Sequence, residues 1–321
     1  MVDMHALEAC AYEREGSNPS SRTISKRKQM FVDKESIRKF CDEQLKDIKA
    51  DPIKHKIAII HSEIANADCK LYMKNKIKVA TNAGFSVELV SVGNKTDLSR
   101  AIDLLNYECV PYIVQLPLNF CYDKDVFCDI RLANDIDNLG YEAKQKLYVS
   151  GNATVSDLPC TARGIYEHLK HLNGGQDLMG NNVCIIGRSD LVGRPLEKWL
   201  RDYCNCNTIV LHRGSSDDYK KAAIRMSDIV VVAVGNVYTF KDFIDWGHLF
   251  ADRIVYDVGI NWAKKPNEDG ELRYKLCGDI PEEWKEWSRM NISPVPGGVG
   301  VLTRTFFVVN AWEKWKACNP A

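Results

Sequence analysis

The sequence lacks several features that mark whole classes of proteins. Its 43 lysines and arginines balance its 43 aspartates and glutamates, so it has no net charge for holding nucleic acid or an anionic membrane. Its longest apolar runs fall well short of the roughly 20 residues that a membrane-spanning helix requires. We therefore expect neither nucleic acid nor a membrane as a partner.

Cysteine is abundant, but the spacing that marks a metal site is missing. The 12 cysteines form no C-x-x-C pair, and Cys204 and Cys206 flank a single asparagine, which is poor spacing for structural zinc. No secretory signal is recognisable. We expect reduced thiols, no bound metal and a cytoplasmic location.

Residues 1–30 resemble an extension rather than part of a folded domain. Residues 17–22 are rich in turn formers, and residues 26–28 are basic. Arginine and serine would suit a mitochondrial presequence, but the acidic residues of this segment do not. A mitochondrial location therefore stays the alternative to a cytoplasmic one.

Two blocks of alternating strands and helices follow this extension. In the first block, we expect strands and helices in alternation at residues 57–60, 63–83, 87–90, 99–106 and 112–116. In the second block, near-continuous aliphatic runs predict strands at residues 183–186, 208–211, 229–234 and 254–256. Strands without polar alternation are buried on both faces, so the sequence predicts an α/β fold with doubly wound parallel sheets. Helices are expected from about Arg163 to Leu172 and from Leu302 to Trp315.

The loop after the first strand of the second block has the composition of a phosphate-binding turn. Gly187 ends the strand, Arg188 and Ser189 follow, and Val192-Gly193 precede a proline suited to the start of a helix. Such a turn places backbone N–H groups and a helix N-terminus against a phosphate. The spacing is not the common G-x-G-x-x-G.

Tyr72 and Lys76 are four residues apart on an expected helix, so they share one face. A lysine held in an apolar cleft has a lowered pKa and can exchange protons near neutral pH. The alternative is a surface lysine beside a half-buried tyrosine. Spacing alone does not exclude that alternative.

Further strings stand in a fixed order along the chain: VQLPL at 114–118, DIDN at 135–138, PCTARG at 159–164, DVGIN at 257–261, GDI at 278–280 and SPVPGGVG at 293–300. Together with GRSDLVGRP at 187–195 and the Y-x-x-x-K of Tyr72 and Lys76, they resemble the folate-dependent methylenetetrahydrofolate dehydrogenase/cyclohydrolases. The chain departs from the family's strings at a few positions: Asn119, Asn134, Asn138, Ala162, Arg163 and Val301. Asn138 replaces a glycine and tolerates a left-handed backbone better than most residues. Thr161 is expected to cap the following helix.

The resemblance implies two domains and a C-terminal helix that returns to the first of them. Residues 31–165 with the helix 302–321 would form the catalytic, folate-binding domain. Residues 166–301 would form a Rossmann-like NAD(P)-binding domain. The family also implies a homodimer and tetrahydrofolate one-carbon derivatives as ligands.

The implied activity is oxidation of 5,10-methylenetetrahydrofolate with NADP, followed by hydrolysis to 10-formyltetrahydrofolate. The residues implied in catalysis are Lys76, Gln115, Asp137 and Tyr72. Substrate binding would use Tyr72, Val114, Gln115, Leu116, Asp137, Pro296, Gly297, Gly298, Val299 and Gly300. Cofactor binding would use Gly187, Arg188, Ser189, Val192, Arg213, Gly235, Ile260 and Thr303.

The choice of dinucleotide follows from the end of the second strand in the second block. NAD-specific sites place an acidic residue there, whereas this strand ends in Leu211-His212-Arg213. Arg213, with Arg188 nearby, would attract a 2′-phosphate. The sequence therefore favours NADP, with NAD as the alternative. The alternative is that Arg188 and Arg213 are ordinary arginines on a solvent-exposed face and bind no phosphate.

Two other functions stay open at the level of sequence. The substitutions at Asn119, Asn134 and Asn138 could spoil the hydrolytic step and leave a monofunctional dehydrogenase. A dinucleotide-binding regulatory protein without turnover is the alternative of another class, although Tyr72, Lys76, Gln115 and Asp137 do not favour it.

Overall fold

The computed structural model describes residues 31–51, 53, 55–63, 67–236, 244–266, 272–286 and 290–319. The extension expected at residues 1–30 lies outside the described residues. None of the described helices is long and apolar enough to cross a membrane.

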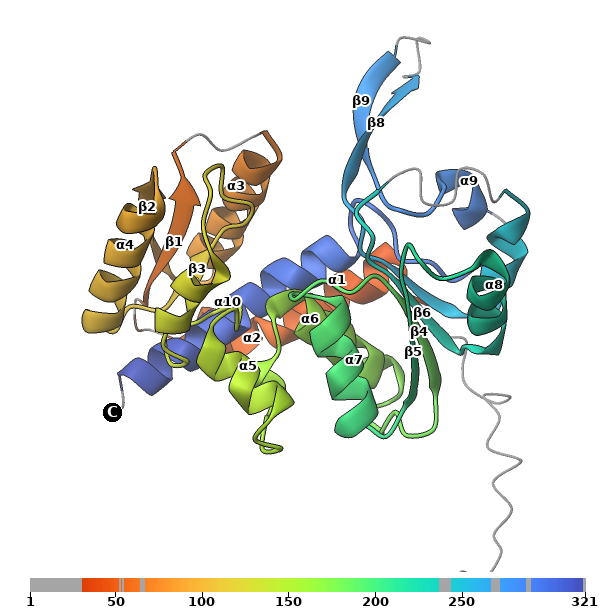
Figure 1. Ribbon diagram of the computed structural model, residues 1–321, viewed down its shortest axis with the longest axis horizontal. Helices are drawn as coiled ribbons and strands as arrows, with labels where there is room; N and C mark the ends of the chain where they lie inside the picture. The colour runs from red at the N-terminus through yellow and green to blue at the C-terminus, as the bar shows by residue number, and fades with distance from the viewer. Residues whose placement is uncertain are drawn as a thin grey trace, which may run out of the picture. The chain divides into compact units, whose positions relative to one another are not determined.

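Three parallel strands form the first sheet, in the order β2-β1-β3. They are β1 (Lys56–Ser62), β2 (Ser86–Val92) and β3 (Tyr112–Val114), and they are connected by α3 (Ala67–Asn82) and α4 (Lys95–Tyr107) (Figure 1). The predicted third strand ran to Leu116. The observed strand ends two residues earlier, although the backbone N–H of Gln115 still donates to the carbonyl of Ile60 at 2.8 Å.

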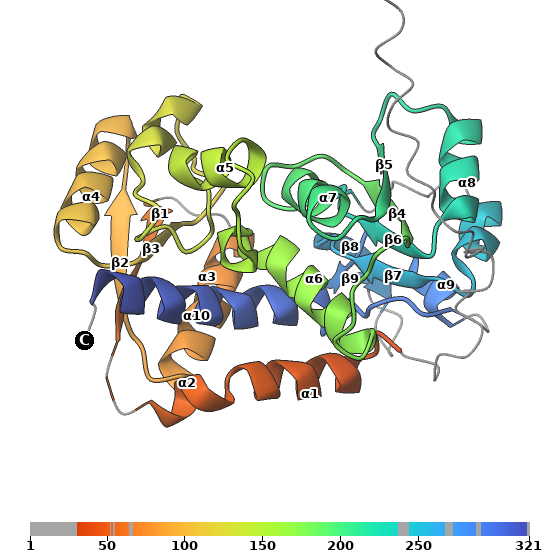
Figure 2. The same ribbon diagram turned by 90° about the horizontal axis from the view of Figure 1, so that it is seen from below.

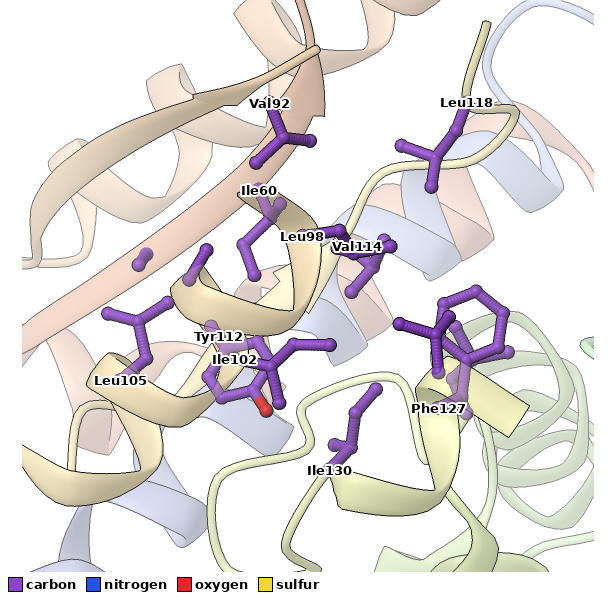
Figure 3. Packing of buried hydrophobic residues seen from close by; sticks show 14 of the residues in the cluster. Ile60, Val92, Leu98, Ile102, Leu105, Tyr112, Val114, Leu118, Phe127 and Ile130 are labelled. Carbon is purple, nitrogen blue, oxygen red and sulfur yellow. The ribbon is translucent and has the colours of Figure 1, made fainter. Parts of the chain in front are cut away.

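One face of α4 closes the core of this sheet. Leu98, Ile102 and Leu105 recur at helical spacing and pack on apolar residues of β1 and β3 (Figure 3). Burying each of these side chains stabilises the fold by about 1.5–3 kcal/mol. Tyr112 donates its hydroxyl proton to Asn106 Oδ1 at 3.1 Å, so the polar atom in this core has a partner.

Four parallel strands form the second sheet, in the order β5-β4-β6-β7. They are β4 (Asn182–Ile186), β5 (Asn207–Leu211), β6 (Ile229–Val232) and β7 (Ile254–Asp257), with the helices α7 (Gly193–Asp202) and α8 (Asp217–Met226) between them. All four strands that the sequence predicted are present, and the predicted α/β class with parallel sheets is confirmed. The sheet order reverses direction between β4 and β6, and this is the point where ligands bind in doubly wound sheets.

The C-terminal helix α10 (Val299–Cys318) packs against helices and a strand from the front half of the chain. It contacts α1 (Lys34–Gln44), α6 (Cys160–Leu172), α3 and β1, and it runs alongside α1 and α6 in Figure 2. The family resemblance implied this return. Both helices are longer than expected: α6 begins at Cys160 rather than Arg163, and α10 continues beyond Trp315.

The remaining described elements are short. They are α2 (Lys46–Ala50), η1 (Lys124–Asp129), α5 (Tyr141–Tyr148), η2 (Val155–Asp157), η3 (Ile244–Phe250), α9 (Glu282–Lys285) and the antiparallel pair β8 (Asn261–Pro266) and β9 (Leu272–Cys277). The β8–β9 pair extends away from the second sheet (Figure 1), and the sequence analysis did not predict it.

A buried histidine joins α6 to the second sheet. His168 has no exposed surface, and its Nδ1 lies 2.7 Å from the hydroxyl of Tyr256 on β7. Burial lowers the pKa of His168 to about 4, whereas an unfolded histidine titrates near 6.5. The unfolded chain therefore binds a proton that the folded chain excludes, and this contribution to stability is lost as the pH falls from about 6.5 towards 4.

The difference between the folded and unfolded pKa values of His168 predicts how the stability of the variant His168→Gln depends on pH. The difference in unfolding free energy between the unmodified protein and the variant should shrink by about 2 kcal/mol between pH 7.5 and pH 5. Urea unfolding at a series of pH values measures it. Burial raises the pKa of Asp135 to about 6, which has the opposite effect on stability below pH 6 but is common to both proteins. Parallel pH profiles would contradict the assignment.

Candidate active site

Lys76 points from α3 into the protein and contacts the end of the first sheet. Its Nζ donates to Gln115 Oε1 at 2.9 Å, and the side chains of Lys76 and Gln115 are 7% and 9% exposed. Tyr72 is one turn earlier on the same helix and lines the same cavity. The alternative of a surface lysine is therefore wrong.

Phe307 of α10 contributes an apolar contact to the surroundings of Lys76. The Nζ of Lys76 lies 5.6 Å from the centre of the Phe307 ring. Gln115 donates its own amide proton to the carbonyl of Leu116 at 2.8 Å, which turns its oxygen towards Lys76. An uncharged acceptor holds the nitrogen of Lys76 in place without adding a counter-charge that would fix it as an ammonium.

Asp137 reaches the same cavity from the segment beside β3. Its Oδ1 accepts the backbone N–H of Cys160 at 2.9 Å, so the carboxylate lies at the N-terminus of α6, where the helix dipole favours negative charge. Asn138 adopts φ 50°, the left-handed conformation expected from its position in the motif. Its amide donates to the carbonyls of Ser156 and Leu158, both at 2.9 Å. The asparagine thus preserves the turn that presents Asp137.

A second carboxylate lies behind this turn. Asp135 is buried, and burial raises its pKa to about 6, although the nearby Lys314 opposes this shift. Its Oδ2 accepts the N–H of Gly140 at 2.7 Å. Lys314 is buried too and donates to the carbonyl of Leu132 at 2.7 Å and to Asn138 Oδ1 at 3.1 Å. These contacts fix the backbone on both sides of Asp137.

The cavity in front of Lys76 has a volume of about 410 Å³. The residues that line it come from α3, from β3 and the segments after it, from α6, from the loop after β4 and from α10: Tyr72, Lys76, Val114, Gln115, Leu116, Pro117, Asp137, Thr161, Leu191 and Thr303. All four residues predicted to be catalytic therefore meet in one space. The sequence predicted that Thr161 caps α6, and this is wrong, because the helix already begins at Cys160. The hydroxyl of Thr161 lies 3.1 Å from that of Thr303 instead.

A smaller cavity of about 70 Å³ adjoins the first through Tyr72, which lines both. Its wall includes Pro296, Gly297, Gly298 and Gly300. Gly298 lets the backbone of this loop pack closely on itself, because a Cβ on Gly298 would lie 2.4 Å from the carbonyl oxygen of Pro294. Ile260 also lines this cavity.

Val299 and Thr303 differ from the positions that the sequence suggested. Val299 is buried at the start of α10 and is not among the described residues that line the two cavities. Thr303 was expected beside the dinucleotide, but it lines the cavity of Lys76.

The loop after β4 approaches its neighbours too closely for any side chain at two positions. A Cβ on Gly187 would lie 2.2 Å from the carbonyl oxygen of Ala233 after β6, and a Cβ on Gly193 would lie 2.2 Å from the carbonyl oxygen of Gly187. Ser189 Oγ accepts the N–H groups of Val192 and Gly193 at 3.2 and 3.5 Å. Backbone, rather than side chains, therefore forms the crevice between β4 and β6.

Arg188 and Arg213 lie at the same edge of this sheet. Ile186 and Leu211 are register partners on β4 and β5, and each arginine follows its partner by two residues. Both arginines are exposed, and the described residues at the end of β5 include no acidic side chain. This edge is positively charged where a dinucleotide-binding sheet holds its ribose.

Two buried carboxylates hold the other side of the crevice. Asp279 accepts the N–H groups of Val234, Gly235 and Asn236 at 2.7–2.9 Å, so Gly235 offers its amide to Asp279. Asp257 accepts the N–H of Asp279 at 2.8 Å and the ammonium of Lys285 at 2.9 Å. Burial raises the pKa of Asp257, and Lys285 opposes that shift.

Glycines make this pair of carboxylates possible. A Cβ on Gly259 would lie 2.2 Å from the Asp279 carboxyl group, and one on Gly278 would lie 1.8 Å from that of Asp257. The strings at 257–261 and 278–280 are therefore two halves of one interlocked structure.

Comparison with known proteins agrees with this geometry. Residues 159–319 match the family model described as "Tetrahydrofolate dehydrogenase/cyclohydrolase, NAD(P)-binding domain". The chain is 34% identical to the bifunctional protein FolD of Anaplasma marginale (strain St. Maries) over 247 residues, which cover 75% of this chain and 77% of that protein. This chain belongs to the tetrahydrofolate dehydrogenase/cyclohydrolase family.

Solved structures of the family have the same fold. FolD of Campylobacter jejuni is 27% identical, with a TM-score of 0.69, and the match covers 88% of this chain and 96% of that one. FolD of Trypanosoma brucei, complexed with NADP cofactor and an inhibitor, is 25% identical, with a TM-score of 0.72 and coverage of 90% and 96%.

The residues of the crevice fit a dinucleotide. Gly187 and Gly193 let the loop after β4 fold tightly on its own backbone and on Ala233, and this glycine turn stands at the position where dinucleotide-binding folds hold the pyrophosphate. Arg188 and Arg213 suit a 2′-phosphate, and Ile260 offers an apolar contact. These are the residues that would hold NADP in this family member.

Sequence reasoning missed several residues of the site. Leu191 lines the cavity of Lys76, Phe307 lies beneath the lysine, and Arg304 lines the smaller cavity. Phe307 belongs to the apolar pattern of a helix that was correctly expected, but no local signal relates it to Lys76. Leu191 and Arg304 have no distinguishing pattern in the sequence.

The contact between Gly193 and Gly187 predicts the effect of adding one methyl group. The variant Gly193→Ala must shift the backbone of the loop, so we expect NADP to bind about tenfold more weakly or worse, a change of about 1.4 kcal/mol. Fluorescence titration with NADPH measures it. Gly93→Ala is the matched control, because its Cβ would meet only the carboxyl group of the exposed Glu63, at 3.1 Å and beyond. Unchanged affinity in Gly193→Ala would contradict the proposed site.

Proposed function

We propose that this chain oxidises 5,10-methylenetetrahydrofolate to 5,10-methenyltetrahydrofolate with NADP and then hydrolyses the product to 10-formyltetrahydrofolate. The observation that carries this proposal is the hydrogen bond of 2.9 Å between Lys76 Nζ and Gln115 Oε1, in a cavity that Tyr72 and Asp137 also line. A buried lysine with a neutral partner is suited to proton transfer next to a cationic carbon.

The folate would be held by Asp137 and Tyr72. The carboxylate of Asp137 can accept two hydrogen bonds from the amino group and ring nitrogen of the pterin, which is a charge-assisted contact. Tyr72 provides a flat face for an aromatic ring of the substrate. Bound NADP would supply the hydride acceptor, its nicotinamide ring, in the crevice on the other side of the cleft.

Lys76 would move the protons of the hydrolytic step. Water adds to the methenyl carbon, and Nζ of Lys76 takes one of its protons. The bond from this carbon to N5 then breaks, and N5 takes a proton from Nζ. The remaining hydroxyl proton leaves to solvent, so the formyl oxygen comes from water and one proton is released overall. Gln115 holds the amine in place through both transfers.

The geometry around Asp137 favours a bifunctional enzyme over a dehydrogenase alone. The substitutions that raised the second possibility do not displace the site. Asn138 keeps the left-handed turn, and the Asn134 amide holds the carbonyls of Leu105 and Val110 at 3.3 and 3.0 Å. Asn119 donates its backbone N–H to Ser62 Oγ at 2.9 Å.

The proposal extends to the organisation of the protein. Residues 31–165 with 302–321 would form the folate-binding domain, and residues 166–301 the dinucleotide-binding domain. The family resemblance implies a homodimer, and the scattered cysteines favour reduced thiols and a cytoplasmic location.

Removal of the Lys76 amine tests the proposed chemistry. The variant Lys76→Met should lose hydrolysis of methenyltetrahydrofolate by about 100-fold or more, because no other group replaces Nζ as the proton carrier. Oxidation of methylenetetrahydrofolate should persist, so that methenyltetrahydrofolate accumulates and is followed by its absorbance.

Lys78→Met is the control for this experiment, because Lys78 is exposed on the same helix. It should hydrolyse methenyltetrahydrofolate as the unmodified protein does. Full hydrolysis by Lys76→Met would exclude the proposed role of the lysine.

Cofactor preference depends on Arg213. In Arg213→Ala, the KM for NADP should rise about 10- to 100-fold, the effect of losing a charge-assisted hydrogen bond, whereas the KM for NAD should stay the same. Initial rates with each dinucleotide measure this. Arg225→Ala, which removes an exposed arginine of α8, is the matched control. An equal rise for both dinucleotides would show that Arg213 does not read the 2′-phosphate.

A further inference from the structure

Arg304 places a guanidinium in the smaller cavity of the cleft. It is in the second turn of α10, is partly buried, and lines the cavity with Tyr72 and Asn75 of α3. A Cβ on Gly300 would lie 3.7 Å from Nη1 of Arg304 and 3.9 Å from Cδ1 of Ile260. The guanidinium therefore lies between α3, α10 and the glycine loop, which is residues 296–298 immediately before α10.

This guanidinium has no counter-charge within the described part of the chain. Burial lowers the pKa of Arg304, and the opposing influences come from Tyr72 and Cys41 rather than from a carboxylate. The other buried cations on and around α10 are partnered: Arg163 pairs with Glu313 at 2.6 Å, and Lys314 donates to Leu132 O and Asn138 Oδ1. A partly desolvated cation without a partner costs stability, so its place in a cleft suggests an anionic ligand.

The path from the first cavity leads to this cation. Tyr72 lines both cavities, so a ring that packs on Tyr72 extends from the space before Lys76 towards Arg304. In a folate, the aminobenzoyl ring is joined to N10, beside the reacting carbon, and it ends in glutamate with two carboxylates. Apart from Arg304, the lining of the smaller cavity presents backbone, apolar side chains, Asn75 and the buried Asp257, which is already paired with Lys285.

We propose that Arg304 binds the glutamate carboxylate of the folate substrate and so selects substrates that carry this tail. A planar guanidinium can bind a carboxylate through two parallel hydrogen bonds. This inference rests on the proposed function. It assigns Arg304 to substrate binding and gives it no part in the chemical step.

The phosphates of the dinucleotide are a poorer match for Arg304. They are expected at the loop between Gly187 and Gly193, at the edge that also presents Arg188 and Arg213. Lys34 of α1 lies beside Gly297, because its aliphatic carbons are 3.2–3.3 Å from the position that a Cβ on Gly297 would occupy. The cation that lines the smaller cavity itself is Arg304.

The test compares two substrates and three variants. One substrate is 5,10-methylenetetrahydrofolate with one glutamate, and the other ends in the methyl amide of the aminobenzoyl group. Arg304→Met should raise the KM about 10- to 100-fold for the first and leave it unchanged for the second. Values of kcat should stay within about twofold. Arg304→Lys keeps the positive charge but loses the two parallel donors of the guanidinium, so its KM for the first substrate should lie between those of the unmodified protein and Arg304→Met. The control Arg100→Met, at an exposed position, should have the KM values of the unmodified protein.

Direct binding provides the second measurement. Calorimetric titration with p-aminobenzoylglutamate should give a Kd that rises in Arg304→Met, while the Kd for NADPH stays unchanged. Equal Kd values for p-aminobenzoylglutamate in the two proteins would overturn the inference, as would an equal rise in KM for both substrates or a rise confined to NADP. Absence of turnover with either substrate in the unmodified protein would instead overturn the proposed function, and the binding measurement would still decide the role of Arg304.

Discussion

The side chain of Asn310 joins three segments that are far apart in the sequence. Its amide donates to the carbonyl of Ile136 at 2.9 Å, and its oxygen accepts a hydrogen bond from Arg163 at 2.5 Å. Arg163 in turn forms two hydrogen bonds with Glu313, at 2.6 and 2.8 Å. The turn that presents Asp137 is thereby fixed to α6 and α10 at once. Because Asn310 is completely buried, loss of either contact would leave a polar group unsatisfied, which costs about 1–3 kcal/mol.

The same helix α10 serves both cavities, and this explains why it returns to the first sheet. Phe307 lies under Lys76, Thr303 lines the larger cavity, and Arg304 lines the smaller one. Residues three and four apart project from one side of a helix, so three neighbouring positions can face a single cleft. The glycine loop immediately before α10 then completes the wall. The helix α10 thus both packs on the first sheet and its helices and supplies side chains to the two cavities.

The sequence predicted the sheets and the shared face of Tyr72 and Lys76 for identifiable physical reasons. Unbroken aliphatic runs such as 183–186 indicate strands buried on both faces, and the i, i+4 spacing of Tyr72 and Lys76 predicts a shared face; the structure has both. It could not predict that Asn310 would hold the turn before Asp137, because the two positions are 174 residues apart and the contact leaves no local pattern. The expected cap at Thr161 was wrong for a local reason, since Pro159 precedes a helix that begins at Cys160.

The loop of the dinucleotide crevice is anchored on the first sheet, and this links the two halves of the proposed reaction. Asp190 accepts a hydrogen bond from Lys124 of η1 at 2.7 Å, and this contact is the main reason that its pKa is lowered. Leu191 packs on the core around Ile60 and also lines the cavity of Lys76. A surface ion pair alone contributes little, but the partly buried Leu191 beside it adds an apolar contact that holds the loop against this core. The loop between Gly187 and Gly193 is therefore part of the wall of the Lys76 cavity, so one structure shapes both the cavity and the crevice between β4 and β6.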